Sequence, residues 1–490
     1  DSLTLPAALL GRVVGVLNWL DVGVAPRRRV RHELDGVRDA GTSNTFPGFV
    51  TPARLHNYYE VPETSAGSAD VQFQEETTQM AYASIGQSWS PDDLQQFQQV
   101  MGVPQQPVTE LDHNGDHSSS CTGSKAQCGE ANLDVQQLSG MSPWSATSFY
   151  YMPSSSSFED FLEDVQQMNP PPEVISISYG APEYSTSASL VRSFDSVAKS
   201  LALQGTTILV SSGDDGANDV GAHYESQGYS CQTVVQQVGL TVSWPASSPW
   251  VTGVGATMGT ESDSPEIACA VNAQGPTATA SKYPPGITSG GGYSQKISKP
   301  SWQLGVSGSM RGVPDLSAAG HAFVVEIGGR LHAADGTSAS CPVVAGMISL
   351  INAELAKAGR SFQSELRGSC EASTGGSCWW LPCDASRGQT TCTRNKCLCE
   401  PGFCAVGGRC VPSTQPTPTP SPPSSRGSVG FINPILYRNP GAFNDITQGN
   451  NNCTKSGKMC CAGYNAAPGW DAVTGMGSPK FEALKAALLR

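Results

Sequence analysis

The stretch Val174-Ile175-Ser176-Ile177-Ser178 is a short apolar run that predicts a buried β-strand. A helical pattern follows over residues 188–203, and a second apolar run, Thr206–Val210, ends in Ser211-Ser212-Gly213-Asp214. Strand, helix and strand in this order predict a β-α-β unit, in which the two strands are parallel and joined by a right-handed crossover. Further strands are suggested at 250–255 and 322–327. We therefore expect an α/β fold on a parallel sheet, with a ligand site beyond the carboxyl ends of the strands, where Asp214 falls.

The bulk composition narrows the class of protein. With 490 residues, the chain is long enough for one large α/β domain or two ordinary ones. A net charge of −13 argues against nucleic acid or an anionic membrane as a partner. We find no run of about 18 apolar residues, so we expect no membrane span. Only 14% of residues are charged, and such a surface changes little when acid neutralises its carboxylates, which hints at acid tolerance.

Sixteen cysteines indicate disulfide chemistry in a secretory or lysosome-like compartment. Eight of them lie between Cys370 and Cys410, and a Pro/Ser/Thr tether follows at 414–425. We interpret 368–427 as an inserted disulfide knot that resembles an EGF-like repeat. A zinc site is the less favoured alternative, because this segment has no histidine and no Cys-x2-Cys pair. A glycosylation sequon, Asn452-Cys453-Thr454, is consistent with the secretory route.

The insertion divides the chain into four parts. Residues 1–46 combine an apolar stretch, a basic cluster and a turn-rich tail, and we interpret them as the end of one unit plus a linker. A uniform region spans 47–367, the insertion takes 368–427, and the first region resumes over 428–490. The start at Asp1, without methionine, suggests a fragment or a processed chain.

The segment Gly336-Thr337-Ser338-Ala339-Ser340-Cys341-Pro342 opens an apolar helical run over 343–356. Serine hydrolases present a nucleophile on such a turn, because the backbone N–H groups of a helix start favour developing negative charge. Ser338 is the candidate nucleophile, and Ser340 is expected to face elsewhere. No histidine lies where it could serve Ser338 in the usual way, so another base is required.

Glu130 and Asp134 are four residues apart, so a helix would place both carboxyl groups on one face. The plain alternative is a solvated helix face. However, Leu133 and Val135 make the segment partly apolar, and two carboxyl groups in a poorly solvated place tend to share a proton, leaving one of them as a base. Asp214 is open to two interpretations in the same way. It is either a turn or capping residue, or a neutral carboxyl that donates a hydrogen bond to an oxyanion.

His113 and His117 raise a further alternative, a subtilisin triad or a metal site. Their flanking residues resemble neither subtilisin motif, and a polar surface loop is the favoured interpretation.

Taken in order, Glu130-x3-Asp134, Ser212-Gly213-Asp214 and Gly336-Thr337-Ser338 resemble the sedolisins, or serine-carboxyl peptidases. The nearest likeness is to their tripeptidyl-peptidase I branch. Supporting neighbours are Ser289–Ser294 and Val313–Ser317, and the likeness runs from Thr51 to Pro479, interrupted by the insertion. The resemblance implies a subtilisin-like, doubly wound, mostly parallel sheet with helices on both faces, in addition to the disulfide-rich insertion.

The resemblance also implies roles for four residues. Ser338 would attack the scissile carbonyl, Glu130 would take its proton, Asp134 would hold Glu130, and Asp214 with the Ser338 N–H would stabilise the oxyanion. A carboxylate base and a neutral carboxyl coexist only in acid, so activity is expected well below neutral pH. By the same likeness, Ser178, Tyr179 and Gly180 would wall the substrate cleft. Asp215 departs from the family, since many relatives carry a small uncharged residue there, and it could raise the pKa of Asp214 by repulsion.

One structural calcium ion is implied as well. Taken alone, the acids of Asn444-Asp445-Ile446 and of 468–475 are loop acids. The resemblance assigns as ligands the side chains of Asp445 and Asp471 and the backbone carbonyls of Ile446, Ala467 and Gly469, a set of oxygens that suits Ca²⁺. Cys453, Cys460 and Cys461 lie between the two halves and are expected to brace them.

The sequence thus favours a monomeric acid peptidase that acts on peptides or unfolded proteins, in a secreted or lysosome-like setting. Release of tripeptides and internal cleavage both remain open. Residues 1–46 would be the remnant of a prosegment. Two alternatives are a neutral subtilisin-like protease that uses His113 or His117, and a non-catalytic protein that binds through the insertion 368–427.

Overall fold

The computed structural model describes most of the chain. The described residues are 25–26, 29–33, 46–63, 68–112, 117–121, 125–369, 373–378, 383–393, 396–399, 403–406, 409–412 and 428–490. The chain divides into two compact units, one formed by 1–353 with 429–490 and the other by 354–428. The apolar stretch of the N-terminal part, His113, Cys370 and the tether 414–425 lie outside the described residues.

An eight-stranded, mostly parallel sheet forms the centre of the larger unit. Its strands, in spatial order, are β11 (Ile267–Ala268), β10 (Thr252–Met258), β8 (Thr207–Ser211), β6 (Val174–Ile177), β3 (Thr78–Ala83), β5 (Ala146–Tyr151) and β4 (Val108–Asp112), with β14 (Leu316–Ala319) also paired to β10. Only β11 is antiparallel to its neighbour. The predicted β-α-β unit is confirmed, because α6 (Ala188–Leu203) joins the parallel strands β6 and β8.

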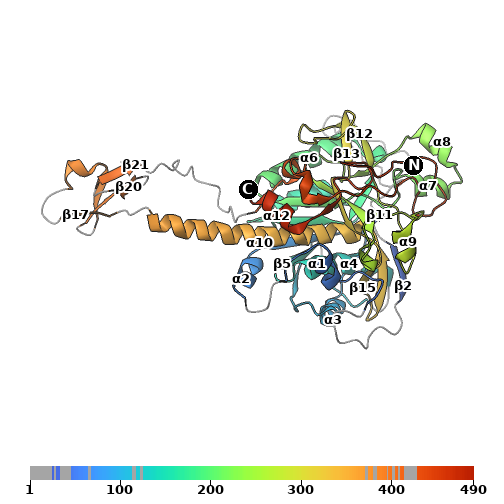
Figure 1. The fold of residues 1–490 in the computed structure, drawn as a ribbon, viewed down its shortest axis with the longest axis horizontal. Coiled ribbons are helices and arrows are strands. Elements are labelled where there is room, and N and C mark those ends of the chain that lie inside the picture. The colour runs from blue at the N-terminus through green and yellow to red at the C-terminus, as the bar shows by residue number, and fades with distance from the viewer. Residues whose placement is uncertain are drawn as a thin grey trace, which may run out of the picture. The chain divides into compact units, whose positions relative to one another are not determined.

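Helices cover both sides of this sheet, as the fold class predicted. Figure 1 shows α6 on one side and α1 and α4 on the other. Besides α6, the α-helices of the described residues are α1 (Pro52–Tyr58), α2 (Ala69–Glu75), α3 (Pro91–Met101), α4 (Lys125–Met141), α5 (Phe158–Gln167), α7 (Gly221–Ser226), α8 (Cys231–Gln237), α9 (Pro276–Ala280), α10 (Thr337–Ser369), α11 (Asn433–Leu436) and α12 (Phe481–Leu488). Among the described helices, the segment Thr337–Ala358 is long and apolar enough to cross a membrane, but it is mostly buried, as expected of a core helix.

The predicted strand at 322–327 belongs to a different sheet. It forms β15 (Phe323–Glu326), antiparallel to β16 (Leu331–Asp335), which also pairs with β2 (Arg29–Glu33). Further small sheets are β1 (Ala25–Pro26) with β7 (Tyr179–Pro182) and β9 (Ser243–Trp244), β12 (Gly292–Ser298) with β13 (Met310–Val313), and β22 (Phe443–Asn444) with β23 (Ser478–Pro479).

Helix α4 is buried from Cys128 to Met141 although it is rich in polar residues. Its side-chain amides replace strand partners for β15: the amides of Asn132 and Gln136 donate to Glu326 O over 3.0 and 2.9 Å, and Gln137 donates to Val324 O over 3.0 Å. Buried amides are tolerated when they are hydrogen-bonded. This is why a helix without an apolar stripe lies inside the protein.

The smaller unit is held by disulfides. A three-stranded sheet of β17 (Ser373–Ser377), β19 (Lys396–Cys399) and β18 (Thr390–Thr393) and a hairpin of β20 (Phe403–Val406) and β21 (Arg409–Pro412) form it. The bonded pairs are Cys378–Cys392, Cys383–Cys397 and Cys399–Cys410. The prediction of disulfides rather than zinc is therefore confirmed for these six residues.

Candidate active site

The nucleophile turn lies between β16 and α10. Ser338 is fully buried at the second position of α10, and its hydroxyl donates to Ser178 O over 3.4 Å. Pro342 lies inside the helix and has no N–H, so Ser338 O lacks its usual helical donor. The Ser178 hydroxyl lies 3.4 Å from this carbonyl instead. The alternative nucleophile, Ser340, points elsewhere and donates to Ala318 O over 3.0 Å.

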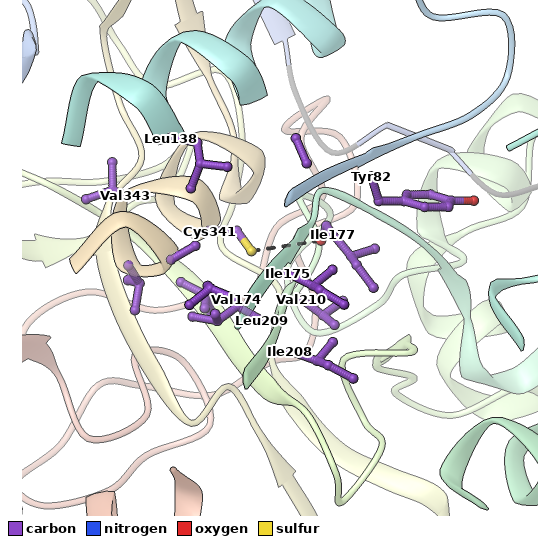
Figure 2. Close-up of a cluster of buried hydrophobic side chains, with 14 of the residues drawn as sticks. Tyr82, Leu138, Val174, Ile175, Ile177, Ile208, Leu209, Val210, Cys341 and Val343 are labelled. Atoms are coloured by element: carbon purple, nitrogen blue, oxygen red, sulfur yellow. Dashed lines mark hydrogen bonds between the residues drawn. The ribbon is translucent and has the colours of Figure 1, made fainter. Parts of the chain in front are cut away.

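The core beneath this turn is apolar. Figure 2 shows Cys341 and Val343 of α10 beside Leu138 of α4 and the side chains of β6 and β8. Burial raises the pKa of the Cys341 thiol to about 12. Cys341 is therefore a packing residue and not a reactive thiol.

Glu130 and Asp134 are 0% and 1% exposed, so the interpretation of a solvated helix face is wrong. They lie one turn apart on α4, on the same face. The Ser178 hydroxyl donates to Asp134 Oδ1 over 2.5 Å. Burial raises the pKa of Tyr179 well above its usual range, and the charges of Glu130 and Asp134 raise it further, which places this phenol close to both acids. The backbone N–H of Glu130 donates to Gln87 Oε1 over 3.1 Å.

Asp214 follows β8 and is buried against the start of α10. Its Oδ1 accepts hydrogen bonds from the backbone N–H and the hydroxyl of Thr337, each over 2.9 Å. The same hydroxyl lies 3.2 Å from Gly213 N, which donates to it. Asp214 thus satisfies a donor at the helix start, as a capping residue does, and it lies beside the residue that precedes Ser338. Thr337 was missed as a positioning residue, although its place next to Ser338 was a signal.

The predicted cleft residues lie on or next to strand β7, which pairs with an extended segment of the same protein. Tyr179 and Gly180 belong to β7, and Ser178 precedes it; all three are buried. On one side β7 pairs antiparallel with Ala25–Pro26, with Ala25 opposite Gly180. An extended segment of this chain therefore lies along the strand that carries the proposed cleft wall.

Asp215 faces a cation. Its Oδ2 lies 2.9 Å from Lys455 Nζ, and its Oδ1 accepts from the backbone N–H of Lys455 over 3.2 Å. Burial raises the pKa of Asp215, and the charge of Lys455 opposes that shift. The pair ties the Asp214 segment to the hairpin that Cys453–Cys460 closes and that Cys231–Cys461 anchors to α8.

Hydrogen bonds link the segments that carry the five predicted calcium ligands. Gly469 N donates to Asp445 Oδ2 over 2.8 Å, and Ala467 N donates to Asp471 Oδ2 over 3.0 Å. The Thr474 hydroxyl lies 3.4 Å from Ile446 O and also 3.1 Å from Asp471 Oδ2. Burial raises the pKa of Asp471. Two carboxylates beside backbone carbonyls in a loop could hold a hard cation, so the residues fit the predicted ion.

Of the two candidate histidines, the structure describes His117. His117 stacks on Tyr151 with ring centroids 3.4 Å apart, and its backbone N–H donates to Glu110. This arrangement agrees with a loop role.

Comparison with known proteins decides the family. The subtilase family matches residues 64–367. The chain belongs to the subtilase family. Its relatives include kumamolisin of Bacillus sp. (strain MN-32), which is 25% identical over 482 residues, 95% of this chain and 68% of the relative. Physarolisin of Physarum polycephalum is 27% identical over 491 residues, which are 90% of this chain and 68% of that relative.

Tripeptidyl-peptidase 1 of Dictyostelium discoideum is 25% identical over 460 residues, which are 89% of this chain and 58% of that relative. Among solved structures, Pseudomonas sedolisin in complex with pseudo-iodotyrostatin matches with a TM-score of 0.56 and 23% identity, covering 89% of this chain and 96% of that one. This match shows the subtilase fold. The sedolisin resemblance predicted from the three motifs is confirmed within the subtilase family.

The Asp215–Lys455 pair predicts a pH-dependent stability for this subtilase. A buried carboxyl with a raised pKa binds a proton that the unfolded chain does not, so stability falls as the pH rises through its titration. Lys455→Met removes the opposing charge and favours the neutral acid further. We expect this variant to lose about 1 kcal/mol of its free energy of unfolding at pH 7, a small value because Lys455 is half-exposed, and to lose little at pH 4.

Denaturant unfolding at both pH values measures the effect. Lys458→Met, on the same hairpin but paired with Glu225 at the surface, is the control and should change little. If Lys455→Met loses the same free energy of unfolding at pH 4 and at pH 7, the charge of Asp215 is not involved.

Proposed function

We propose that this chain is an acid-acting serine-carboxyl peptidase, in which Ser338 is the nucleophile and Glu130 the general base. The observation that carries the proposal is a buried series of polar contacts. The Ser178 hydroxyl joins the carboxylate of Asp134 to the carbonyl of Ser338, and Glu130 lies one helical turn from Asp134. Carboxyl groups in such a place are arranged for proton transfer and not for solvation.

The proposed reaction divides the work among four groups. The hydroxyl oxygen of Ser338 bonds to the carbonyl carbon, and Glu130 takes the hydroxyl proton. Asp214, neutral in acid, and the Ser338 N–H stabilise the oxyanion. The C–N bond then breaks, and Glu130 gives its proton to the leaving amine. Water attacks the acyl-enzyme with Glu130 again as base, which releases the acid product and restores Ser338.

Substrate binding follows from the pairing of β7. Because Ala25–Pro26 lie antiparallel on this strand, an extended peptide can pair with the same backbone groups, with Ser178, Tyr179 and Gly180 as its wall. Peptides and unfolded segments meet that requirement. Both tripeptide release and internal cleavage stay candidates, since some relatives are named tripeptidyl-peptidases and others, such as kumamolisin, have names that state no mode of cleavage. Mass spectrometry of the products of one defined peptide separates the two. The disulfides support a secreted or lysosome-like location.

We also propose one structural calcium ion, held by Asp445 and Asp471 with the carbonyls of Ile446, Ala467 and Gly469. It would join the segment after β22 to the loop that leads to β23, and it would compensate the burial of Asp471. Its contribution is to stability.

Substitutions of the nucleophile and the base test the mechanism. On a denatured protein at pH 4, Ser338→Ala should lower activity by about four orders of magnitude, and Glu130→Gln by a similar factor, because each removes a participant of the same proton transfer. Ser340→Ala is the matched control, and it should keep near wild-type rates. Full activity in either Ser338→Ala or Glu130→Gln rejects the assignment.

Calcium removal should lower the melting temperature. If the free ion is held at a hundred times its dissociation constant, its loss on chelation costs about 2.7 kcal/mol of stability. Asp471→Asn should be less stable in calcium and insensitive to chelator. Asp263→Asn, an exposed acid paired with Arg54, should keep the full response. A chelator effect of equal size in Asp471→Asn excludes this site.

A further inference from the structure

His321 lies between β14 and β15, 1% exposed, and each of its ring nitrogens faces oxygen atoms. Nδ1 lies 2.7 Å from Oδ1 of Asp335, which is also 1% exposed. Nε2 lies 2.8 Å from the hydroxyl oxygen of Ser281 and 3.0 Å from the carbonyl oxygen of Tyr283. None of these contacts belongs to the catalytic group described above.

The partners of Asp335 identify it as an acceptor. Its Oδ1 accepts from Ala322 N over 2.8 Å, and its Oδ2 accepts from Gly286 N over 2.9 Å. Both carboxyl oxygens already accept from backbone N–H groups, so Asp335 is placed to accept from the imidazole as well. The hydrogen bond at Nδ1 therefore requires a proton on Nδ1.

The surroundings of Nε2 favour a proton there as well. The Tyr283 carbonyl can only accept, and the Ser281 hydroxyl lies 2.9 Å from that same carbonyl, to which it donates. A neutral imidazole with its proton on Nδ1 would turn the lone pair of Nε2 toward a carbonyl oxygen 3.0 Å away. Ser281, His321 and Asp335 thus have the spacing of a Ser-His-Asp triad, but a protonated Nε2 would have no lone pair to act as a base.

The pair is joined directly to the nucleophile turn. Gly336 follows Asp335, and its N–H donates over 2.9 Å to the carbonyl of Gly320, which precedes His321. There is no spare room at this junction, since a Cβ on Gly320 would lie 2.6 Å from Ser340 Oγ and 2.9 Å from Gly336 O. A shift of His321 relative to Asp335 would therefore move the backbone that leads into Ser338.

We propose that His321 is an imidazolium ion-paired with Asp335, and that this pair clamps the strand leading into Ser338 in acid and releases it as the pH rises. Protonated histidine that gains a partner stabilises the fold at low pH, and that stability is lost as the proton leaves. The two residues are positioning residues, and their link to catalysis rests on the function proposed for Ser338.

Other ionisable residues lie on the segments next to the pair. On the loop that contains Ser281, the Lys282 ammonium lies 5.3 Å from the ring centroid of Tyr283. Strand β2 brings ionisable residues into backbone register with β16, namely Arg29, His32 and Glu33. On β15, Glu326 pairs with Leu331 at the far end of β16 from Asp335. Among the described contacts of His321, Asp335 supplies the carboxylate.

The charge of His321 can be measured directly. Histidine labelled with ¹⁵N in the full chain carrying Ser338→Ala, which prevents self-digestion, reports the protons on both nitrogens, and His321→Asn in that background assigns the signal. We expect both nitrogens to be protonated at pH 5 and to remain so above the usual titration of histidine, about pH 6.5. An unprotonated nitrogen at pH 5 overturns the proposal.

Stability and kinetics test the clamp. The asparagine amide of His321→Asn can donate to Asp335 without carrying a charge. Between pH 5 and pH 8 the wild type should lose thermal stability that this variant does not lose, and at pH 6 the variant should show about tenfold lower kcat with unchanged KM. His223→Asn is the matched control, because His223 contacts Gln227 on the surface of α7.

The outcomes are distinguishable. Wild-type pH dependence of both melting temperature and kcat in His321→Asn rejects the clamp. Suppose that His321 is protonated and the melting temperature depends on pH as expected, but the wild type hydrolyses no peptide. That result rejects the proposed function and still supports the ion pair. If His321→Asn fails to fold, the labelled Ser338→Ala chain still tests whether His321 is protonated. The other six histidines are then each substituted singly, His223→Asn among them, and the signal that remains unassigned belongs to His321.

Discussion

The candidate site depends on a single buried hydroxyl. Ser178 Oγ lies between the carboxylate of Asp134, 2.5 Å away, and the carbonyl of Ser338, 3.4 Å away. The second contact exists because Pro342 lacks the N–H that would otherwise bond to that carbonyl. One side chain therefore connects α4, which carries the two acids, to α10, which carries the proposed nucleophile. A change that moves either helix changes the distance between base and nucleophile.

Burial gives these groups their chemistry. Isolated carboxylates in an apolar interior are costly, and they are retained where hydrogen bonds and function compensate. The carboxylate of Asp134 is compensated by the hydrogen bond from the Ser178 hydroxyl, while the core under α10 is apolar (Figure 2). The Asp215–Lys455 pair extends the same principle, since it lets a second acid adjoin Asp214 without facing it.

The sequence predicted the β-α-β unit because apolar runs and a helical period are local signals. The catalytic motifs were found because each is short and contiguous. The burial of α4 was harder to predict, since its amides of Asn132, Gln136 and Gln137 bond to β15, which lies about 190 residues further along the chain. A polar residue gives no local sign that its partner is a distant strand. The direction of Asp215 and the contacts of His321 were beyond local reasoning for the same reason.

The pH dependence of kcat/KM on one small peptide substrate tests the central claim most directly, namely that a carboxyl group and not an imidazole activates Ser338. A carboxylate base working with a neutral carboxyl predicts a maximum near pH 4 and a decline toward neutrality. A profile that rises through pH 6–7 to a neutral plateau would mark a histidine base and contradict the account.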